Sequence, residues 1–203
     1  MKHYTVNEVF YSLQGEGVRA GTANIFVRFS GCNMRCAVEP GEKSPGGFDC
    51  DTEFTSGRRM TAQELRALCD EIRLDCKTVI FTGGEPALQI DDELLDAFED
   101  FHKAIETNGS LAVPCAARFD WITVSPKVAE HCIKQLEAHE VKYVRGYGQG
   151  VPRTVINAIH KLISPAFESH EMNSRTVQWC IDLVKQNPDW RLSAQLHNLW
   201  RVR

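Results

Sequence analysis

Three of the eight cysteines stand close together and could hold a metal centre. They are Cys32, Cys36 and Cys50, in a loop that follows a predicted strand. Structural zinc usually takes four Cys or His ligands, and a 4Fe–4S cluster normally takes four Cys ligands, whereas the nearest further cysteines are Cys69 and Cys76. A cluster held by three thiolates leaves one iron open, which a purely structural site would not need. On spacing alone, zinc and an iron–sulfur cluster remain equal alternatives.

A second candidate is the stretch F-T-G-G-E-P at residues 81–86, at the C-terminal end of a predicted strand. Its paired glycines would let a ligand approach the backbone closely, and Glu85 offers a carboxylate to an amine. In parallel α/β folds, ligands bind at this edge of the sheet. Taken alone, a glycine pair before a helix is more often an ordinary turn.

The elements that must position these residues alternate along the chain. Strands are predicted at 25–29, 78–82, 104–107, 121–124, 142–144, 161–163 and 191–196. Helices are predicted after the Thr61–Glu64 capping box, from residue 91, and along the apolar stripes at 129–136 and 177–184. This alternation indicates βαβ units. The strands are too few for a closed eight-stranded barrel, so we expect an α/β fold: an incomplete TIM-like barrel of about six parallel strands with flanking helices.

Length and composition set the class. A chain of 203 residues with 43% hydrophobic and 25% charged residues suits one globular domain, 1–203, in which the Pro- and Gly-rich segment 37–49 is a loop. No apolar run is long enough to span a bilayer and no signal peptide is evident, so we expect a cytoplasmic protein. The net charge of −4 argues against a nucleic-acid surface. The five scattered cysteines are expected to be small buried hydrophobes: Cys69, Cys76, Cys115, Cys132 and Cys180.

Together, the G-C-N-x-x-C stretch, the third cysteine followed by Asp51 and Thr52, and G-G-E-P one βα unit later resemble the radical S-adenosylmethionine (SAM) enzymes. More narrowly, the chain is similar to the 7-carboxy-7-deazaguanine synthase family. The segments that match are S-L-Q-G-E-G at 12–17, C-D-T-x-F at 50–54, E-T-N-G at 106–109, S-P-K at 125–127 and R-L-S-A-Q-L-H at 191–197. The G-G-E-P stretch or the cysteines alone would be weakly specific, whereas all the motifs in this order are strongly specific.

This resemblance implies a radical reaction. Cys32, Cys36 and Cys50 would ligate a 4Fe–4S cluster whose open iron chelates SAM, and reduction would yield a 5′-deoxyadenosyl radical. The radical would take a hydrogen from C6 of 6-carboxy-5,6,7,8-tetrahydropterin. Ring contraction with loss of ammonia would give 7-carboxy-7-deazaguanine for queuosine and 7-deazapurine biosynthesis. The residues implied for SAM are Asp49, Gly83, Gly84, Glu85, Thr107, Asn108, Ser125, Pro126 and Lys127.

The resemblance also implies a pterin site, a magnesium ion and partners. The residues implied for the pterin are Leu13, Gln14, Gly15, Glu16, Arg28, Thr82 and His197. Thr52 would supply its hydroxyl to Mg²⁺ beside the substrate carboxylate, for which Arg28 is a natural partner. An electron donor such as flavodoxin or ferredoxin and a homodimer are implied as well. Taken singly, Thr52 could be an ordinary loop hydroxyl and His197 a structural histidine.

The cysteine spacing departs from the usual radical-SAM pattern, because C-x₃-C-x₁₃-C replaces C-x₃-C-x₂-C. Loop closure entropy grows slowly with length, so the insertion at 37–49 is tolerable. We expect it to reshape the docking surface of the electron donor. Two alternatives remain: another radical-SAM enzyme, such as a glycyl-radical activating enzyme, and a non-catalytic zinc-binding module. Neither would need all the motifs above.

Overall fold

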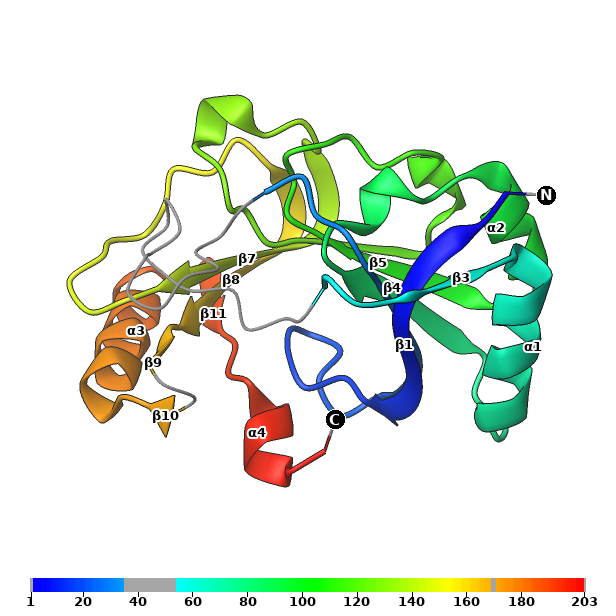
Figure 1. Ribbon diagram of the computed structural model, residues 1–203. Coiled ribbons are helices and arrows are strands. Elements are labelled where there is room, and N and C mark those ends of the chain that lie inside the picture. The colour runs from blue at the N-terminus through cyan, green and yellow to red at the C-terminus, as the bar shows by residue number, and fades with distance from the viewer. Residues whose placement is uncertain (1, 35–53, 169–170, 203) are drawn as a thin grey trace.

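The computed structural model describes residues 2–34, 54–168 and 171–202, and these contain a nine-stranded sheet in the order β11-β8-β7-β6-β5-β4-β2-β1-β3. Seven consecutive members are parallel. They are β2 (Ala23–Phe29), β4 (Thr78–Gly83), β5 (His102–Thr107), β6 (Trp121–Val124), β7 (Glu137–Arg145), β8 (Asn157–Pro165) and β11 (Trp190–Leu192). The sheet curves but stays open (Figure 1), which confirms the incomplete α/β barrel. All seven predicted strands are present, although β11 ends at Leu192.

Two antiparallel strands at one edge were not expected from the sequence. β1 (Tyr4–Leu13) pairs with β2 and with β3 (Arg58–Met60). The β1–β2 register shifts between Val6 and Glu8. A bulge of this kind moves later side chains to the other face, so Val6 and Val9 both pack into the main core although they are three positions apart. The hydrophobic alternation that predicts a strand is therefore broken within β1. A separate small sheet joins β9 (Phe167–Glu168) to β10 (Glu171–Met172).

Three helices cover one face of the sheet at its two ends (Figure 1). α1 (Ala62–Ile72) and α2 (Asp92–Ala97) lie near β1, and α3 (Ser174–Gln186) packs on β8 and β11. The capping box at Thr61 and Glu64 is present, and Asp91 caps α2. None of the described helices is long and apolar enough to cross a membrane.

Alternate strand residues divide the sheet into two faces. The helix-covered face holds the main core, in which Phe81 contacts the rings of Phe29, Phe98 and Phe119. The opposite, concave face carries a small apolar cluster made of Phe10, Phe26, Ile80 and Ala104. Polar side chains lie on this concave face farther toward the carboxyl ends of the strands.

The helix predicted along 129–136 is wrong. That segment holds only a short 3₁₀ turn, Glu130–Cys132, before β7 begins. Tertiary contacts compete with the helix: the Glu130 carboxylate accepts hydrogen bonds from the Tyr143 hydroxyl and the Val155 N–H, and the amide groups of Lys134 and Gln135 donate to the Gly109 carbonyl.

Of the five scattered cysteines, Cys69 and Cys180 are buried as expected. Cys76 and Cys115 are half-buried, and Cys132 is exposed, so the packing role expected for Cys132 is wrong. Its apolar stripe had indicated a buried helical face, and that helix does not form.

Candidate active site

Four turns meet at one edge of the sheet because the carboxyl ends of parallel strands lie on the same side. Cys32 follows β2, Gly84 follows β4, Asn108 follows β5 and Ser125 follows β6. The order β2-β4-β5-β6 sets these turns in a row. The Ser125 N–H donates to the Thr107 carbonyl at 2.8 Å, so neighbouring turns contact one another. The structure therefore gathers the described residues that the motifs assigned to the cluster and to SAM.

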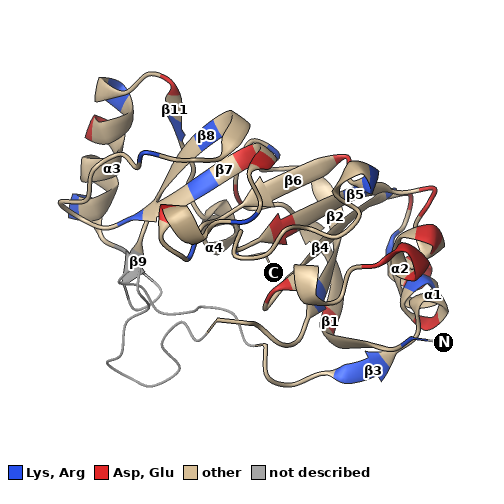
Figure 2. Ribbon diagram, turned by 90° about the horizontal axis from the view of Figure 1, so that it is seen from above, with Lys and Arg blue, Asp and Glu red and all other residues tan. Residues whose placement is uncertain are grey.

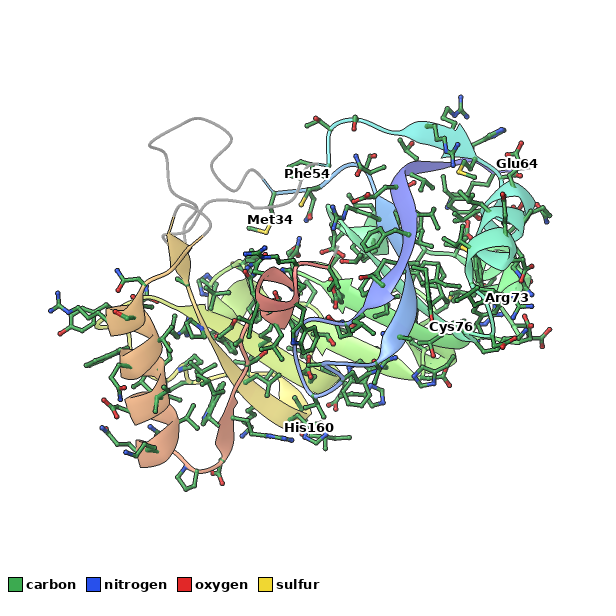
Figure 3. The ribbon with its side chains drawn as sticks, turned by 90° about the horizontal axis from the view of Figure 1, so that it is seen from below. Met34, Phe54, Glu64, Arg73, Cys76 and His160 are labelled. Atoms are coloured by element: carbon green, nitrogen blue, oxygen red, sulfur yellow. The ribbon has the colours of Figure 1, made fainter. Side chains whose placement is uncertain are left out.

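The two ends of the loop that carries the three cysteines, called here the cysteine loop, lie next to each other at this edge of the sheet. The Gly31 N–H donates to the Phe54 carbonyl at 2.8 Å, and the Ser30 hydroxyl donates to the Ser56 carbonyl. Gln89 supports the stem, since its side-chain amide donates to the Ser30 carbonyl at 2.8 Å. Figure 3 shows Met34 and Phe54 near each other, where the described chain stops and resumes.

Several residues expected in the site lie outside the described residues. They are Cys36, Asp49, Cys50 and Thr52, together with the loop 37–49. Of the three expected cluster ligands the structure thus describes Cys32, which is half-buried.

The glycine pair packs directly against the base of the cysteine loop. The Gly84 N–H donates to the Phe29 carbonyl at 3.0 Å, and the Glu85 N–H donates to the Gly31 carbonyl at 2.9 Å. A Cβ atom at Gly84 would stand 2.1 Å from the Gly31 carbonyl oxygen, so a side chain at this position would separate the two turns. The G-G-E-P turn fits the cysteine loop because residue 84 is glycine.

Glu85 joins two turns through a fully buried carboxylate, whose side chain is 0% exposed. One oxygen accepts from the Thr107 hydroxyl at 2.8 Å and the Ala87 N–H at 2.9 Å, and the other accepts from the Asn108 N–H at 2.8 Å. Burial raises the pKa of the Glu85 carboxyl, although these hydrogen bonds act in the opposite direction. Both oxygens are thus engaged within the chain, which gives Glu85 the role of holding the E-T-N-G turn in place.

Asn108 extends this connection to the cysteine loop. Its Nδ2 atom lies 3.9 Å from Cys32 Sγ and 3.3 Å from Asn33 Oδ1. The Asn33 side-chain amide in turn donates to the Ser110 hydroxyl at 2.8 Å. The three turns after β2, β4 and β5 therefore form one hydrogen-bonded unit around Cys32.

The residues expected to contact the pterin gather on the concave face. Glu106 joins two of them, because its carboxylate accepts from Gln14 Nε2 at 2.8 Å and from the Thr82 hydroxyl at 3.0 Å. Arg28 is paired in register with Thr82 and forms an ion pair with Glu8 at 2.6 Å. Amide, hydroxyl and guanidinium groups thus surround one patch of the sheet, which suits a small planar ligand with several polar atoms.

The loop after β1 is held by the C-terminal segment. The Leu196 N–H donates to the Gly15 carbonyl at 2.8 Å. A Cβ atom at Gly15 would lie 2.4 Å from His197 Nδ1, so the His197 side chain fills the space beside this glycine. Figure 1 shows α4 (Leu196–Trp200) beside the loop that joins β1 to β2. His197 therefore lies next to the other expected pterin residues.

Two charged residues of the site, Glu140 and Lys142 on β7, were missed. Glu16 forms a largely buried ion pair with Lys142, and Glu140 accepts a hydrogen bond from the Val18 N–H at 2.7 Å. The available signal was Lys142 at the start of the strand predicted at 142–144, because both faces of a parallel strand are normally apolar. Glu140 lies before that predicted strand, and only the longer β7 of the structure places it beside Lys142.

Comparison with known proteins agrees with this arrangement. Residues 13–147 match the family described as "4Fe-4S single cluster domain". The 7-carboxy-7-deazaguanine synthase of Bacteroides thetaiotaomicron is 36% identical over 98% of both chains. That of Bradyrhizobium diazoefficiens is 36% identical over 98% of this chain and 99% of its own. The crystal structure of QueE from Escherichia coli superposes with a TM-score of 0.69 and 26% identity, covering 95% of this chain and 94% of the other.

The fold and the site define an iron–sulfur enzyme of the radical-SAM class. Identity above 30% over nearly the full length then settles the family. The chain belongs to the 7-carboxy-7-deazaguanine synthases.

Proposed function

We propose that this enzyme converts 6-carboxy-5,6,7,8-tetrahydropterin into 7-carboxy-7-deazaguanine and ammonia, in the biosynthesis of queuosine and related 7-deazapurines. The observation that carries the proposal is the meeting of the cysteine loop, the G-G-E-P turn and the E-T-N-G turn at one edge of the sheet, above a concave face lined by Gln14, Thr82 and Arg28. The family membership supports the same reaction.

The described residues fit an iron–sulfur cluster held by Cys32, Cys36 and Cys50. The closed stem brings both ends of the cysteine loop to the carboxyl end of β2. Elsewhere in the described chain, no group of three His, Cys, Asp or Glu residues could hold a metal ion. When bound, the cluster and SAM supply a 5′-deoxyadenosyl radical.

The chain's own residues would hold SAM in one orientation. The Gly83–Gly84 backbone, Thr107, Asn108 and the Ser125-Pro126-Lys127 turn would contact it, while Asp49 lies outside the described residues. Glu85 contributes through Asn108, whose N–H its carboxylate holds at 2.8 Å. This fixed geometry would orient the cofactor before the reaction begins.

The pterin would lie on the concave face, framed by Leu13, Gln14, Gly15, Glu16, Arg28, Thr82 and His197. Arg28 offers a half-exposed guanidinium, which suits bidentate contact with the substrate carboxylate. Gln14 and Thr82 are fixed by their shared partner Glu106, so their polar atoms are preorganised for a planar ring.

Magnesium, partners and location belong to the same proposal. The Thr52 hydroxyl would bind Mg²⁺ beside the substrate carboxylate. A flavodoxin or ferredoxin would deliver the electron, the enzyme would act as a homodimer, and it would work in the cytoplasm. Thr52→Ala should weaken the dependence of activity on Mg²⁺, whereas an unchanged magnesium titration would remove Thr52 from the metal site.

The reaction is tested by reconstituting the enzyme anaerobically with iron and sulfide and adding SAM, reductant, Mg²⁺ and 6-carboxytetrahydropterin. A 7-deazapurine product is expected, and Cys32→Ala should abolish both the cluster absorbance and the product. SAM cleavage without a 7-deazapurine would point to another radical-SAM enzyme, such as a glycyl-radical activating enzyme. A colourless protein that retains zinc would contradict the radical-SAM assignment.

A further inference from the structure

β7 sends two charged side chains onto the concave face, beneath the loop that follows β1. Lys142 and Glu140 are two residues apart and therefore point to the same side of the strand. Figure 2 shows both signs of charge along β7. Each of these side chains contacts the loop at residues 14–18, called here the pterin loop because Gln14, Gly15 and Glu16 belong to it.

Lys142 binds the pterin loop through Glu16. Their side chains are 12% and 16% exposed, so the ion pair is largely removed from water. Burial raises the pKa of the Glu16 carboxyl, but the charge and hydrogen bond of Lys142 bring it below its usual value, with smaller contributions from His197 and Gln195. Burial lowers the pKa of Lys142, and the carboxylates of Glu16, Glu106 and Glu140 together raise it above its usual value. Both partners are thus charged near neutral pH.

Glu140 packs against the pterin loop at Gly17 and Val18, where the loop has no side chain at residue 17. Its carboxylate, on a residue 3% exposed, accepts from the Val18 N–H at 2.7 Å and from the Thr123 hydroxyl at 3.3 Å. A Cβ atom at Gly17 would stand 2.4 Å and 2.6 Å from the two carboxylate oxygens, and the Gly17 φ of +73° favours glycine. Glu140 therefore occupies the space that a side chain at residue 17 would need.

The C-terminal segment holds the other side of the pterin loop. The Ser193 hydroxyl accepts from the Gly17 N–H at 2.9 Å, and the Leu196 N–H donates to the Gly15 carbonyl. The loop is thus fixed from two directions. On the β7 side, the Lys142–Glu16 pair joins opposite charges, whereas Glu140 accepts a hydrogen bond from the backbone of the loop.

We infer that Lys142 and Glu140 are positioning residues that fix the pterin loop over the concave face, and that Lys142 acts through Glu16. Removing one partner of a buried ion pair leaves the other charge unpaired, and the segment that carries it moves toward water. Loss of Lys142 should therefore displace Glu16 and the loop. The inference rests on the proposed function only in naming the ligand that the loop contacts.

The test uses four variants of the cluster-loaded enzyme: Lys142→Met, Lys142→Arg, Glu16→Gln and the double variant. Lys142→Met should raise KM for 6-carboxytetrahydropterin at least tenfold with a smaller change in kcat. Lys142→Arg, which keeps the charge, should recover part of this loss. In the double variant, Lys142→Met with Glu16→Gln, hydrogen exchange of residues 12–18 should be slower than in Lys142→Met, because no unpaired charge remains buried. Lys134→Met, which changes an exposed lysine, is the matched control and should behave as the wild type.

Hydrogen exchange of residues 12–18 without substrate gives a second, independent readout. Exchange in this segment should be faster in Lys142→Met and close to wild type in Lys142→Arg. Unchanged exchange and unchanged KM in Lys142→Met would overturn the inference. Exchange in the double variant as fast as in Lys142→Met would also overturn it, since the unpaired Glu16 charge would then not be what displaces the loop. If the wild type makes no 7-deazapurine while the exchange result holds, the proposed function fails and the positioning role stands.

Discussion

The side-chain amide nitrogen of Asn108 lies 3.9 Å from the sulfur of Cys32. The Met34 N–H approaches the same sulfur at 3.4 Å. Hydrogen bonds to cluster sulfurs are among the features that set the reduction potential of iron–sulfur proteins. Asn108, in the turn after β5, thus contacts the expected cluster ligand Cys32 and also belongs to the expected SAM site.

Replacing Asn108 with Leu should lower the midpoint potential of the cluster. The hydrogen bond stabilises negative charge on the sulfur, and a contribution of about 1 kcal/mol corresponds to about 40 mV for a one-electron couple. A redox titration followed by electron paramagnetic resonance, without SAM, measures the effect on the cluster alone. Ser110→Ala removes only the contact to Asn33 and should leave the potential unchanged. An Asn108→Leu potential equal to that of the wild type would exclude this contact as a determinant.

Gly84→Ala should impair assembly of the cluster. The new methyl group would stand 2.1 Å from the Gly31 carbonyl oxygen, so the cysteine loop must move away from the G-G-E-P turn. Iron and sulfide content after reconstitution should fall to less than about half of the wild-type value, because ligand geometry is lost. Gly150→Ala is the control, since a Cβ there meets nothing within 4 Å. Equal iron content in both variants would contradict the expected clash.

Phe81→Ala should be severely destabilising. The ring is 0% exposed and lies 5.5 Å from the Phe98 ring and 6.0 Å from the Phe29 ring, centroid to centroid. Loss of a buried Phe side chain costs about 3–5 kcal/mol in the free energy of unfolding. Urea denaturation measures this change. Leu199→Ala, at a residue 68% exposed, should stay within about 0.5 kcal/mol of the wild type.

Asp91 should make the free energy of unfolding depend on pH in the acidic range. Its carboxylate accepts from Lys2 Nζ and the Tyr4 hydroxyl, each at 2.7 Å, and from the Leu94 N–H at 2.9 Å. Burial raises the pKa of Asp91, but these hydrogen bonds bring it below its usual value. The stabilisation is therefore fully present above the unfolded pKa of about 4 and is lost as the pH falls through the lower folded value.

Asp91→Asn keeps a capping oxygen but has no charge to lose. The difference in Tm between wild type and variant should shrink between about pH 7 and about pH 3. Asp182→Asn, whose side chain accepts from Gln178 within α3, is the control and should differ little from the wild type at either pH. A constant difference for Asp91→Asn would show that its charge does not stabilise the fold.

The parallel strands could be predicted because each is a short apolar run bounded by turns, and the four turns at the carboxyl edge follow from strand order. β1 could not, because the shift between Val6 and Glu8 breaks its alternation. The false helix at 129–136 had the correct apolar period, and contacts such as Glu130 with Tyr143 overrode it. Glu85 was expected to offer its carboxylate to an amine, whereas only the folded chain reveals its three internal donors.

The hydrogen bond between the Leu196 N–H and the Gly15 carbonyl joins residues from opposite ends of the chain. During synthesis the N-terminal partner leaves the ribosome long before the C-terminal one. A nascent chain that has reached β6 already contains Cys32 and the G-G-E-P and E-T-N-G turns, but it lacks Lys142, Ser193 and Leu196 to hold the pterin loop. The residues that hold the pterin loop are thus the last part of the site to be synthesised, after Cys32 and the two turns beside it.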